Sequence, residues 1–256
     1  MCGRYLVDDE VYADMWMLLN SLRADPGADP GAVPGATQGT TQSMAPGAAS
    51  GVVPCTVSGA VSGVALDMAP GAASGMASDL APGAASSTAS YLAKGEVFPS
   101  NIAPVFTKSG AEAVKWGFPH WKNASVIINA RAETALEKNM FKKPLLERRC
   151  VIPSSGFYEW SRAGSGKKKD KFLLRHPGER VLYMAGMINT FRDATGSTYS
   201  AFVILTTAAN ESVAAIHDRM PVILAPDERD RWLSDDDFME HALHRPGPEL
   251  ESELST

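Results

Sequence analysis

The chain of 256 residues is long enough for one or two domains, and its composition excludes several classes of protein. Its three cysteines, Cys2, Cys55 and Cys150, are odd in number and widely spaced, so they do not make a disulfide framework. No CxxC or HxxxH spacing indicates a metal site, and no stretch approaches 18 consecutive apolar residues. We therefore expect a cytoplasmic protein of a reducing compartment, with no metal, no cofactor and no membrane contact.

The formal net charge of −5 is unevenly distributed. Residues 25–90 hold four acids and no Lys or Arg, and the chain from Asp227 onward holds ten acids against three arginines. The remainder holds 15 acids and 21 bases, a charge of about +6. Such a basic core suits a polyanion partner, because Lys and Arg release counterions from phosphates. A basic surface that is simply solvated explains the charge equally well.

The chain opens MCGRY, and removal of Met1 would give Cys2 a free α-amine beside its thiol. The reference pKa of an α-amine is about 7.7–8.0, so part of it is neutral at pH 7 and adds to an aldehyde as an imine. The thiol then closes a five-membered thiazolidine, an intramolecular step with effective molarities on the order of 10⁵ M or more. The same arrangement serves N-terminal nucleophile hydrolases, whose thiol attacks an amide. The remaining interpretation is that position 2 is a cysteine by chance and takes part in no reaction.

A helix is predicted from Val7 to Leu22, since apolar side chains recur on one face at Val11, Met15, Leu18, Leu19 and Leu22. Residues 25–90 follow, with no aromatic residue and with MAPGAASG at 44 and 68 and LAPGAASS at 80. Because this segment buries too little apolar surface to offset its conformational entropy, we expect a disordered insert. The folded domain is then 1–24 joined to 91–245, followed by an acidic tail over 246–256.

Short β-rich runs recur after the insert: SVIINA, RRCVIP, KFLLR, VLYMAGM, AFVILTT and MPVIL. Helical stretches are expected between them near 133–147, 210–216 and 227–243, the last packing on the domain through Trp232, Leu233 and Phe238. Strand runs with few intervening helices favour an α+β domain built on a curved, mostly antiparallel, barrel-like sheet with flanking helices.

Two motifs carry polar groups suited to a reaction. In NARA, Asn129 offers two donors and an acceptor for a hydroxyl or carbonyl oxygen, and Arg131 suits a phosphate. A strand-end Asn that caps the following helix is the alternative. In GFYEW, Glu159 lies between two aromatic residues, where partial desolvation raises the pKa of an acid, and Trp160 offers a stacking platform. An exposed Glu in an aromatic strand is the plainer interpretation.

Two further motifs are open to two interpretations each. IHDRMP places His217, which suits proton transfer, beside Asp218 and ahead of Arg219, which suits a phosphate or an ion pair with Asp218. A histidine satisfied by a backbone carbonyl is the alternative. KWGFPHW brings Trp116 and Phe118 to a turn, either as core or as a stacking wedge, and core is favoured for Phe118.

The order of these motifs resembles the SRAP family. The matching segments are MCGRY, SNIAP (100–104), KWGF, INARAET, a cysteine-containing strand, GFYEW and AIHDRMPVIL, which run from Met1 to about Leu224 around the insert. The resemblance implies a protein that loses Met1 and captures abasic sites in single-stranded DNA as a thiazolidine, without cofactor and as a monomer, near the nucleoid if bacterial. It implies thiol autopeptidase and lyase activities at the same site.

The resemblance also assigns roles to residues. Cys2 would be the nucleophile, Asn129 would position the sugar or the cysteine terminus, and Glu159 and His217 would transfer protons. The predicted DNA-binding residues are Arg4, Arg131, Trp116, Trp160 and Arg219. An enzyme that releases ammonia from glutamine, in the manner of class II amidotransferases, is the alternative, because such chains also begin MCG. A non-catalytic nucleic-acid-binding module is a third interpretation.

Overall fold

The computed structural model describes residues 3–24, 93–120, 122–161 and 169–255. The chain divides into two units, residues 1–30 with 84–256 and residues 31–83, and the second lies outside the described residues. The predicted insert at 25–90, with Cys55, lies outside them too, as does Cys2. No helix in the described part of the chain is long and apolar enough to span a membrane.

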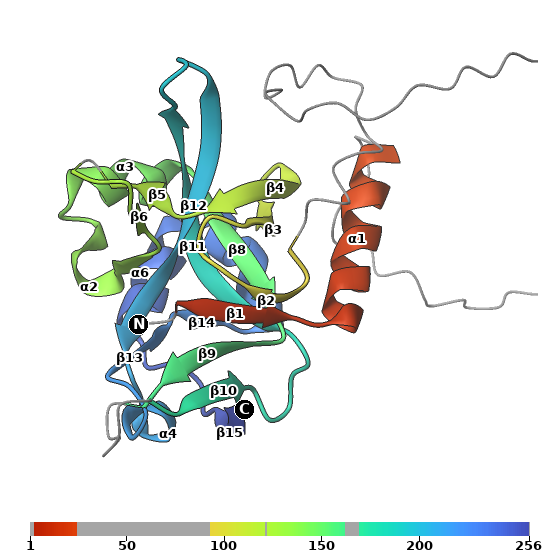
Figure 1. The fold of residues 1–256 in the computed structure, drawn as a ribbon, viewed down its shortest axis with the longest axis vertical. Coiled ribbons are helices and arrows are strands. Elements are labelled where there is room, and N and C mark those ends of the chain that lie inside the picture. Colours follow the sequence, from red (N-terminus) through yellow and green to blue (C-terminus); the bar gives the residue numbers. More distant parts are fainter. Residues whose placement is uncertain (1–2, 25–92, 121, 162–168, 256) are drawn as a thin grey trace, which may run out of the picture. The chain divides into compact units, whose positions relative to one another are not determined.

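A closed barrel of five strands forms the centre of the described unit (Figure 1). Its strands follow the order β12–β4–β3–β8–β11, and β11 pairs with β12 to close the ring. All neighbours are antiparallel except the parallel pair β12 and β4. The strands are β3 (Ile102–Thr107), β4 (Gly110–Trp116), β8 (Arg149–Ser154), β11 (Leu182–Arg192) and β12 (Thr198–Ala208). The predicted α+β class with a curved, barrel-like sheet is confirmed.

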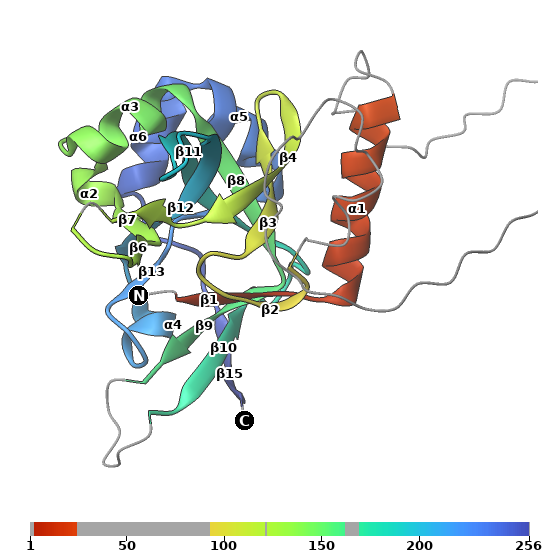
Figure 2. The same ribbon diagram turned by 45° about the horizontal axis from the view of Figure 1, so that its top comes forward.

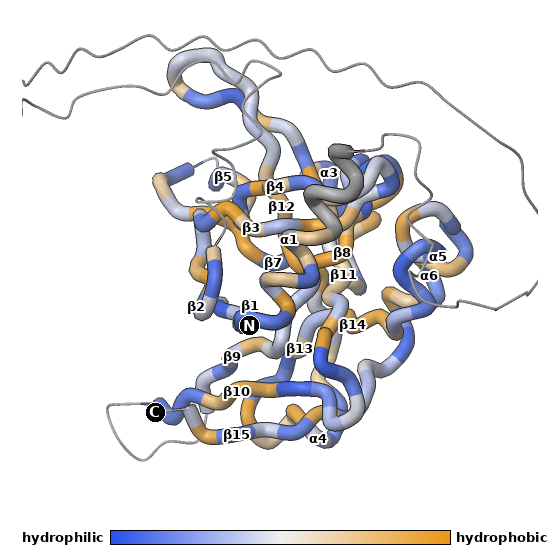
Figure 3. The backbone as a smooth tube through the Cα atoms, turned by 90° about the vertical axis from the view of Figure 1, so that its right-hand side faces the viewer, coloured by the Kyte–Doolittle hydropathy of each residue, from blue (hydrophilic) through white to orange (hydrophobic). Residues whose placement is uncertain are grey.

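The barrel strands are buried on both faces, which explains their continuous apolar runs. Successive side chains of a strand point to opposite faces. In β12, Phe202 and Ile204 join one hydrophobic cluster, and Ala201, Val203 and Leu205 join another. The tube in Figure 3 is accordingly hydrophobic along β8 and β14 (Ile223–Leu224). Alternate residues of this one strand thus belong to two different hydrophobic clusters.

A glycine allows the barrel strands to approach closely. A Cβ at Gly186, in β11, would lie 2.5 Å from Ile152 Cδ1 and 2.6 Å from the Val203 carbonyl oxygen. Any larger residue there would separate β11 from β8 and β12, so the curvature depends on this position.

Short strands extend the barrel at the end of β12. There β12 pairs on one side with β7 (Asn129–Arg131) and on the other with β13 (Arg219–Pro221). Strand β14 lies beside β11, and β5 (Phe118–Pro119) pairs with β6 (Val126–Ile127).

Helices cover two sides of the barrel. Figures 1 and 2 show α2, α3 and α6 together on one side and α1 on the other. Trp232, fully buried, and Phe238 anchor the C-terminal helices, as predicted. The helices are α1 (Asp9–Ala24), α2 (Ala132–Ala135), α3 (Asn139–Glu147), α4 (Glu211–Ala214), the 3₁₀ helix η2 (Pro226–Glu228), α5 (Arg229–Ser234) and α6 (Asp236–His244).

Helix α1 begins at Asp9, two residues later than predicted. The Asp8 side chain accepts a hydrogen bond from the backbone N–H of Val11 at 3.0 Å, which caps the helix N-terminus. Val11 and Met15 are buried as expected, whereas the predicted contacts of Leu18, Leu19 and Leu22 fall outside the described side chains. The residues before Asp8 form a strand instead of a first helical turn.

A second sheet of five strands, in the order β15–β10–β9–β1–β2, lies beside the barrel. Every neighbouring pair in it is antiparallel. Close packing at Gly156 joins two of its strands, because a Cβ there would lie 2.6 Å from the Leu174 carbonyl oxygen. The strands are β1 (Arg4–Val7), β2 (Gly95–Val97), β9 (Gly156–Trp160), β10 (Lys171–Arg175) and β15 (Glu251–Ser255).

The structure corrects the predicted end of the domain. Residues 246–256 were expected to form an acidic tail, but β15 pairs with β10 along its whole length. Four of its five residues are exposed, so it carries no apolar pattern that predicts a strand. Charged side chains suit such an edge strand, because they discourage further pairing.

Candidate functional site

The start of the chain lies beside the strand that carries Glu159. Arg4 is the first residue of β1 and lies opposite Tyr158 of β9, the neighbour of Glu159. Cys2 lies outside the described residues, two positions before Arg4 in the sequence. The strand that follows the predicted nucleophile along the chain therefore pairs with the strand that carries Glu159.

Glu159 is buried and holds its proton near neutral pH. Its exposed fraction is 2%, and it lies in the middle strand of the second sheet. Burial raises the pKa of Glu159 to about 7, and the negative charge of Asp218 adds to the rise. The sequence-based expectation of a desolvated acid is confirmed here. Both forms of the carboxyl group are populated at neutral pH, as suits a proton carrier.

His217 and Asp218 lie between α4 and β13. Nδ1 of His217 accepts a hydrogen bond from the backbone N–H of Arg219 at 3.1 Å and lies 3.1 Å from Oδ1 of Asp218. A neutral ring that accepts from Arg219 carries its proton on Nε2, whereas a ring protonated on both nitrogens pairs with Asp218. The two arrangements exclude each other, so the surroundings of His217 accommodate both protonation states.

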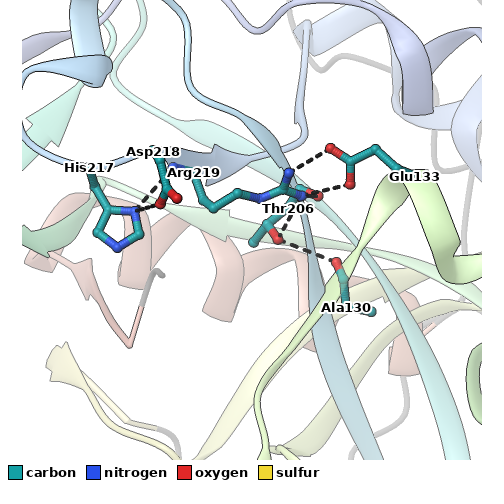
Figure 4. Close-up of polar contacts among 6 residues, drawn as sticks. All are labelled: Ala130, Glu133, Thr206, His217, Asp218 and Arg219. Carbon is teal, nitrogen blue, oxygen red and sulfur yellow. Dashed lines mark hydrogen bonds and ion pairs between the residues drawn. The ribbon is translucent and has the colours of Figure 1, made fainter.

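Arg219 joins the segment of His217 to the segment of Asn129 (Figure 4). Its two terminal nitrogens donate to the two carboxylate oxygens of Glu133 at 2.5 and 2.8 Å, and one also donates to the Thr206 carbonyl. The hydroxyl of Thr206 donates to the Ala130 carbonyl at 3.4 Å. The hydrogen bonds from Arg219 lower the pKa of Glu133.

This contact corrects the role predicted for Arg219. Its side chain is only 12% exposed and is paired with Glu133, not with Asp218. A bidentate pair of this kind fixes geometry as well as charge. In this structure Arg219 is therefore a positioning residue, which holds the residues before β13 against those after β7.

Asn129 reaches the same region through strand pairing. It opens β7 and lies opposite Ile204 in the parallel pair with β12, and β13 flanks β12 on the other side. Strand β12 thus lies between β7, which begins with Asn129, and β13, which begins two residues after His217. Nothing in the sequence AFVILTT, which forms much of β12, predicts that this strand brings the two segments together. Arg131, at the end of β7, is exposed.

Arg4 lies against two aromatic rings. Its guanidinium carbon is 4.6 Å from the ring centroid of Phe98 and 5.0 Å from that of Trp160. It donates to Glu96 at 2.8 Å, and Lys171 donates to the other oxygen of Glu96 at 2.7 Å. Burial opposes ionisation of Glu96, but these hydrogen bonds outweigh it and lower its pKa.

The prediction that Trp116 stacks on a DNA base is wrong. The side chain is fully buried, with its ring centroid 5.1 Å from that of Tyr5 and 6.3 Å from that of Phe202. Its Nε1–H donates to the Ile128 carbonyl at 3.1 Å. Trp116 is a core residue because β4 turns this face into the barrel. Phe118 is buried too, as predicted.

Two further observations concern Cys150 and possible metal ligands. Burial raises the pKa of the Cys150 thiol well above its usual range, so Cys150 is unsuited to nucleophilic attack. The described residues contain no group of three or more His, Cys, Asp or Glu side chains that would hold a metal ion.

Phe98 and Glu96 were missed by sequence reasoning. Both lie in the run EVFPSN, of which only the last two residues belong to the motif SNIAP. An aromatic residue directly before a Pro-Ser-Asn turn is the available signal, because such a turn holds the ring at the surface.

Comparison with known proteins agrees with this arrangement. The family model described as "SOS response associated peptidase (SRAP)" matches residues 70–254. The "Abasic site processing protein YoqW" of Bacillus subtilis is 35% identical over 168 residues, which cover 58% of this chain and 75% of that protein. The corresponding protein YedK of Escherichia coli is 34% identical over 123 residues, covering 48% and 54%. HMCES of Gallus gallus, with the same description, is 34% identical over 154 residues, covering 50% and 45%.

Solved structures share the fold. A protein from Bacteroides thetaiotaomicron superposes with a TM-score of 0.57 at 26% identity, covering 63% of this chain and 78% of that one. A protein from Bordetella bronchiseptica superposes with a TM-score of 0.55 at 22% identity, covering 63% and 87%. The matched residues include the strands that carry Asn129 and Glu159 and the segment of His217. This chain belongs to the SRAP family.

Proposed function

We propose that this protein processes abasic sites in single-stranded DNA by capturing them covalently through Cys2. The family match and the names of the relatives support abasic-site processing. The observation that carries the chemical proposal is the buried carboxyl group of Glu159, with a pKa of about 7, beside the strand that starts two residues after Cys2.

The capture needs no cofactor. After Met1 is removed, the α-amine of Cys2 adds to the aldehyde carbon of the ring-opened deoxyribose, and one water leaves as the imine forms. The sulfur then adds to the imine carbon, and the thiol proton passes to the nitrogen. The product is a thiazolidine, and one water is lost overall. The second attack is fast because both nucleophiles belong to one residue.

Three side chains assist these steps. Protonated Glu159 donates a proton to the departing hydroxyl, and His217 transfers protons during ring opening. Asn129 holds the sugar hydroxyl or the amine through its amide. Arg4 and Arg131 contact backbone phosphates, and Trp160 stacks on a base.

Related activities would use the same groups. The thiol of Cys2, activated by a neighbouring base, would release Met1 in an autopeptidase reaction. An imine at the deoxyribose also acidifies the adjacent carbon, so loss of its proton with departure of the 3′ phosphate would give lyase activity.

Intact-mass spectrometry of the protein mixed with an abasic single-stranded oligonucleotide tests the proposal. We expect an adduct that survives denaturation, with the mass of both components minus one water, and no adduct from Cys2→Ala. Cys2→Ser is the matched control, because it keeps the amine but loses the sulfur, so any imine it forms should reverse under denaturing conditions. A mature protein that retains Met1, or an adduct that persists in Cys2→Ala, would contradict the proposal. Steady release of ammonia from glutamine would favour the amidotransferase alternative.

A further inference from the structure

An aromatic–basic row, made of Phe98, Arg4, Trp160 and Lys171, lies at one end of the second sheet. Arg4 begins β1, Trp160 ends the antiparallel neighbour β9, and Lys171 begins β10 opposite Trp160. Phe98 directly follows the end of β2. Four neighbouring strands therefore bring these side chains to the end of the sheet where the chain starts.

The row alternates aromatic rings with cations. The Arg4 guanidinium lies over both the Phe98 and the Trp160 ring, and the Lys171 ammonium lies 4.0 Å from the centroid of Tyr158. Glu96 accepts hydrogen bonds from both cations, so in these contacts two positive charges face one negative charge. Positive charge interleaved with ring faces is the pattern that binds single-stranded nucleic acid.

Phe98 is the exposed member of the row. It is 40% exposed, whereas the large aromatic residues Tyr5, Phe118 and Phe157 are fully buried. Arg4 contacts its ring but leaves this fraction open to solvent. A core interpretation therefore does not account for an aromatic residue at this position.

A tight turn holds Phe98 at the surface. Its backbone N–H donates to Oδ1 of Asn101 at 2.9 Å, and the N–H of Asn101 donates to the Phe98 carbonyl at 3.0 Å. Ser100 adopts a positive φ of 72°, the one such non-glycine residue in the described part of the chain. The N–H of Ser100 donates to the carbonyl of buried Trp116 at 2.8 Å. Backbone strain at an anchored turn is typical of ligand-binding positions.

We propose that Phe98 is a stacking site for an unpaired base of the bound DNA strand, next to the abasic nucleotide. This inference rests on the proposed function, because it takes the strand from the capture site at Cys2 along the aromatic–basic row. The ring accepts any base, because every base has a π-face, and the phosphates that flank the base meet Arg4 and Lys171. The arginine that contacts the ring also restrains it, so less freedom is lost when the base binds.

Binding of an oligonucleotide with a tetrahydrofuran abasic analogue isolates this step, because the analogue has no aldehyde and cannot be captured. We expect Phe98→Leu, which keeps apolar volume but lacks a π-face, to weaken binding by about five- to a hundredfold in fluorescence anisotropy. Phe98→Trp should bind like the wild type. Ile102→Ala is the matched control, because Ile102 is 41% exposed and lies beyond the same turn.

Two readouts separate stacking from other roles. The dependence of affinity on salt should stay unchanged in Phe98→Leu, since no phosphate contact is removed. A 2-aminopurine placed beside the analogue should be quenched by the wild type and less by Phe98→Leu. Equal affinity and equal quenching in Phe98→Leu and Phe98→Trp would overturn the inference.

The same variants distinguish this inference from the proposed function. At saturating abasic DNA, Phe98→Leu should still form the covalent adduct. A wild type that binds the analogue through Phe98 but forms no adduct would overturn the capture chemistry alone. An adduct that forms normally, with binding independent of Phe98, would overturn the stacking site alone.

Discussion

Glu159 has its carboxyl group where water cannot stabilise the charge. Because the folded protein holds this proton to about pH 7, and an unfolded chain releases it near 4.5, the folded state binds more protons between those values. The free energy of unfolding should therefore fall as pH rises from about 4.5 to about 7. A group selected only for stability would avoid this cost, so the position favours a chemical purpose.

Replacing this residue should reverse the loss. Relative to the wild type, Glu159→Gln should be more stable at pH 8 than at pH 5. We expect a difference of about 2.5 kcal/mol, since about two units of the pKa shift lie between these pH values, at 1.36 kcal/mol each. Urea denaturation at the two pH values measures it.

The matched control is Glu253→Gln, at an exposed position of the same sheet. It should change stability equally at both pH values. A Glu159→Gln effect that does not depend on pH would contradict the raised pKa.

At the scale of elements, the pair Arg219 and Glu133 connects the segments of His217 and Asn129. We expect Arg219→Gln and Glu133→Gln each to slow capture by about tenfold, and the double variant to be no slower than either, because both remove one contact. The concentration of DNA that gives half the maximal rate should stay unchanged, since the pair positions groups and does not bind the strand. Single-turnover capture rates measure both quantities.

The control for this prediction is Arg180→Gln, which removes ion pairs with Glu10 and Asp14 at the start of α1. It should leave the capture rate unchanged. A double-mutant cycle in unfolding free energy should give a coupling of about 1 kcal/mol for Arg219 and Glu133, because the Glu133 side chain is 42% exposed and solvent screens the pair. Additive effects on the capture rate would argue against the positioning role.

At the scale of the whole molecule, β15 completes the sheet that holds Glu159. We expect a chain truncated after Leu250 to expose the backbone of β10 and to lose hydrogen-exchange protection at alternate β10 residues, those whose N–H points to β15, while the barrel strand β12 stays protected. The strand buries little apolar surface, so the loss should come from its backbone pairing. Equal protection of β10 in both chains would show that β15 contributes nothing to the sheet.

The sequence predicts those parts of the fold that depend on residues close together in the chain. Runs such as AFVILTT are strands because both faces are buried, and GFYEW indicated a desolvated acid because its neighbours are aromatic. Strands β1 and β15 were missed because β1 has only four residues and four of the five residues of β15 are polar, so neither carries a clear apolar pattern. Closure of the barrel depends on the parallel pair β12 and β4, whose residues are about 90 positions apart. The contact of Arg219 with Glu133 is likewise set by β12, which contributes no predicted site residue.

The pairing of Arg4 with Tyr158 sets how far the beginning of the chain extends. Strand residues advance by about 3.3 Å each, so one extra residue ahead of Cys2 would shift the amine by a comparable distance while the register stayed in place. In the proposed capture, a label or affinity tag at that end would act as a spacer between the Cys2 amine and Glu159. Attachment after Ser255 leaves this spacing intact.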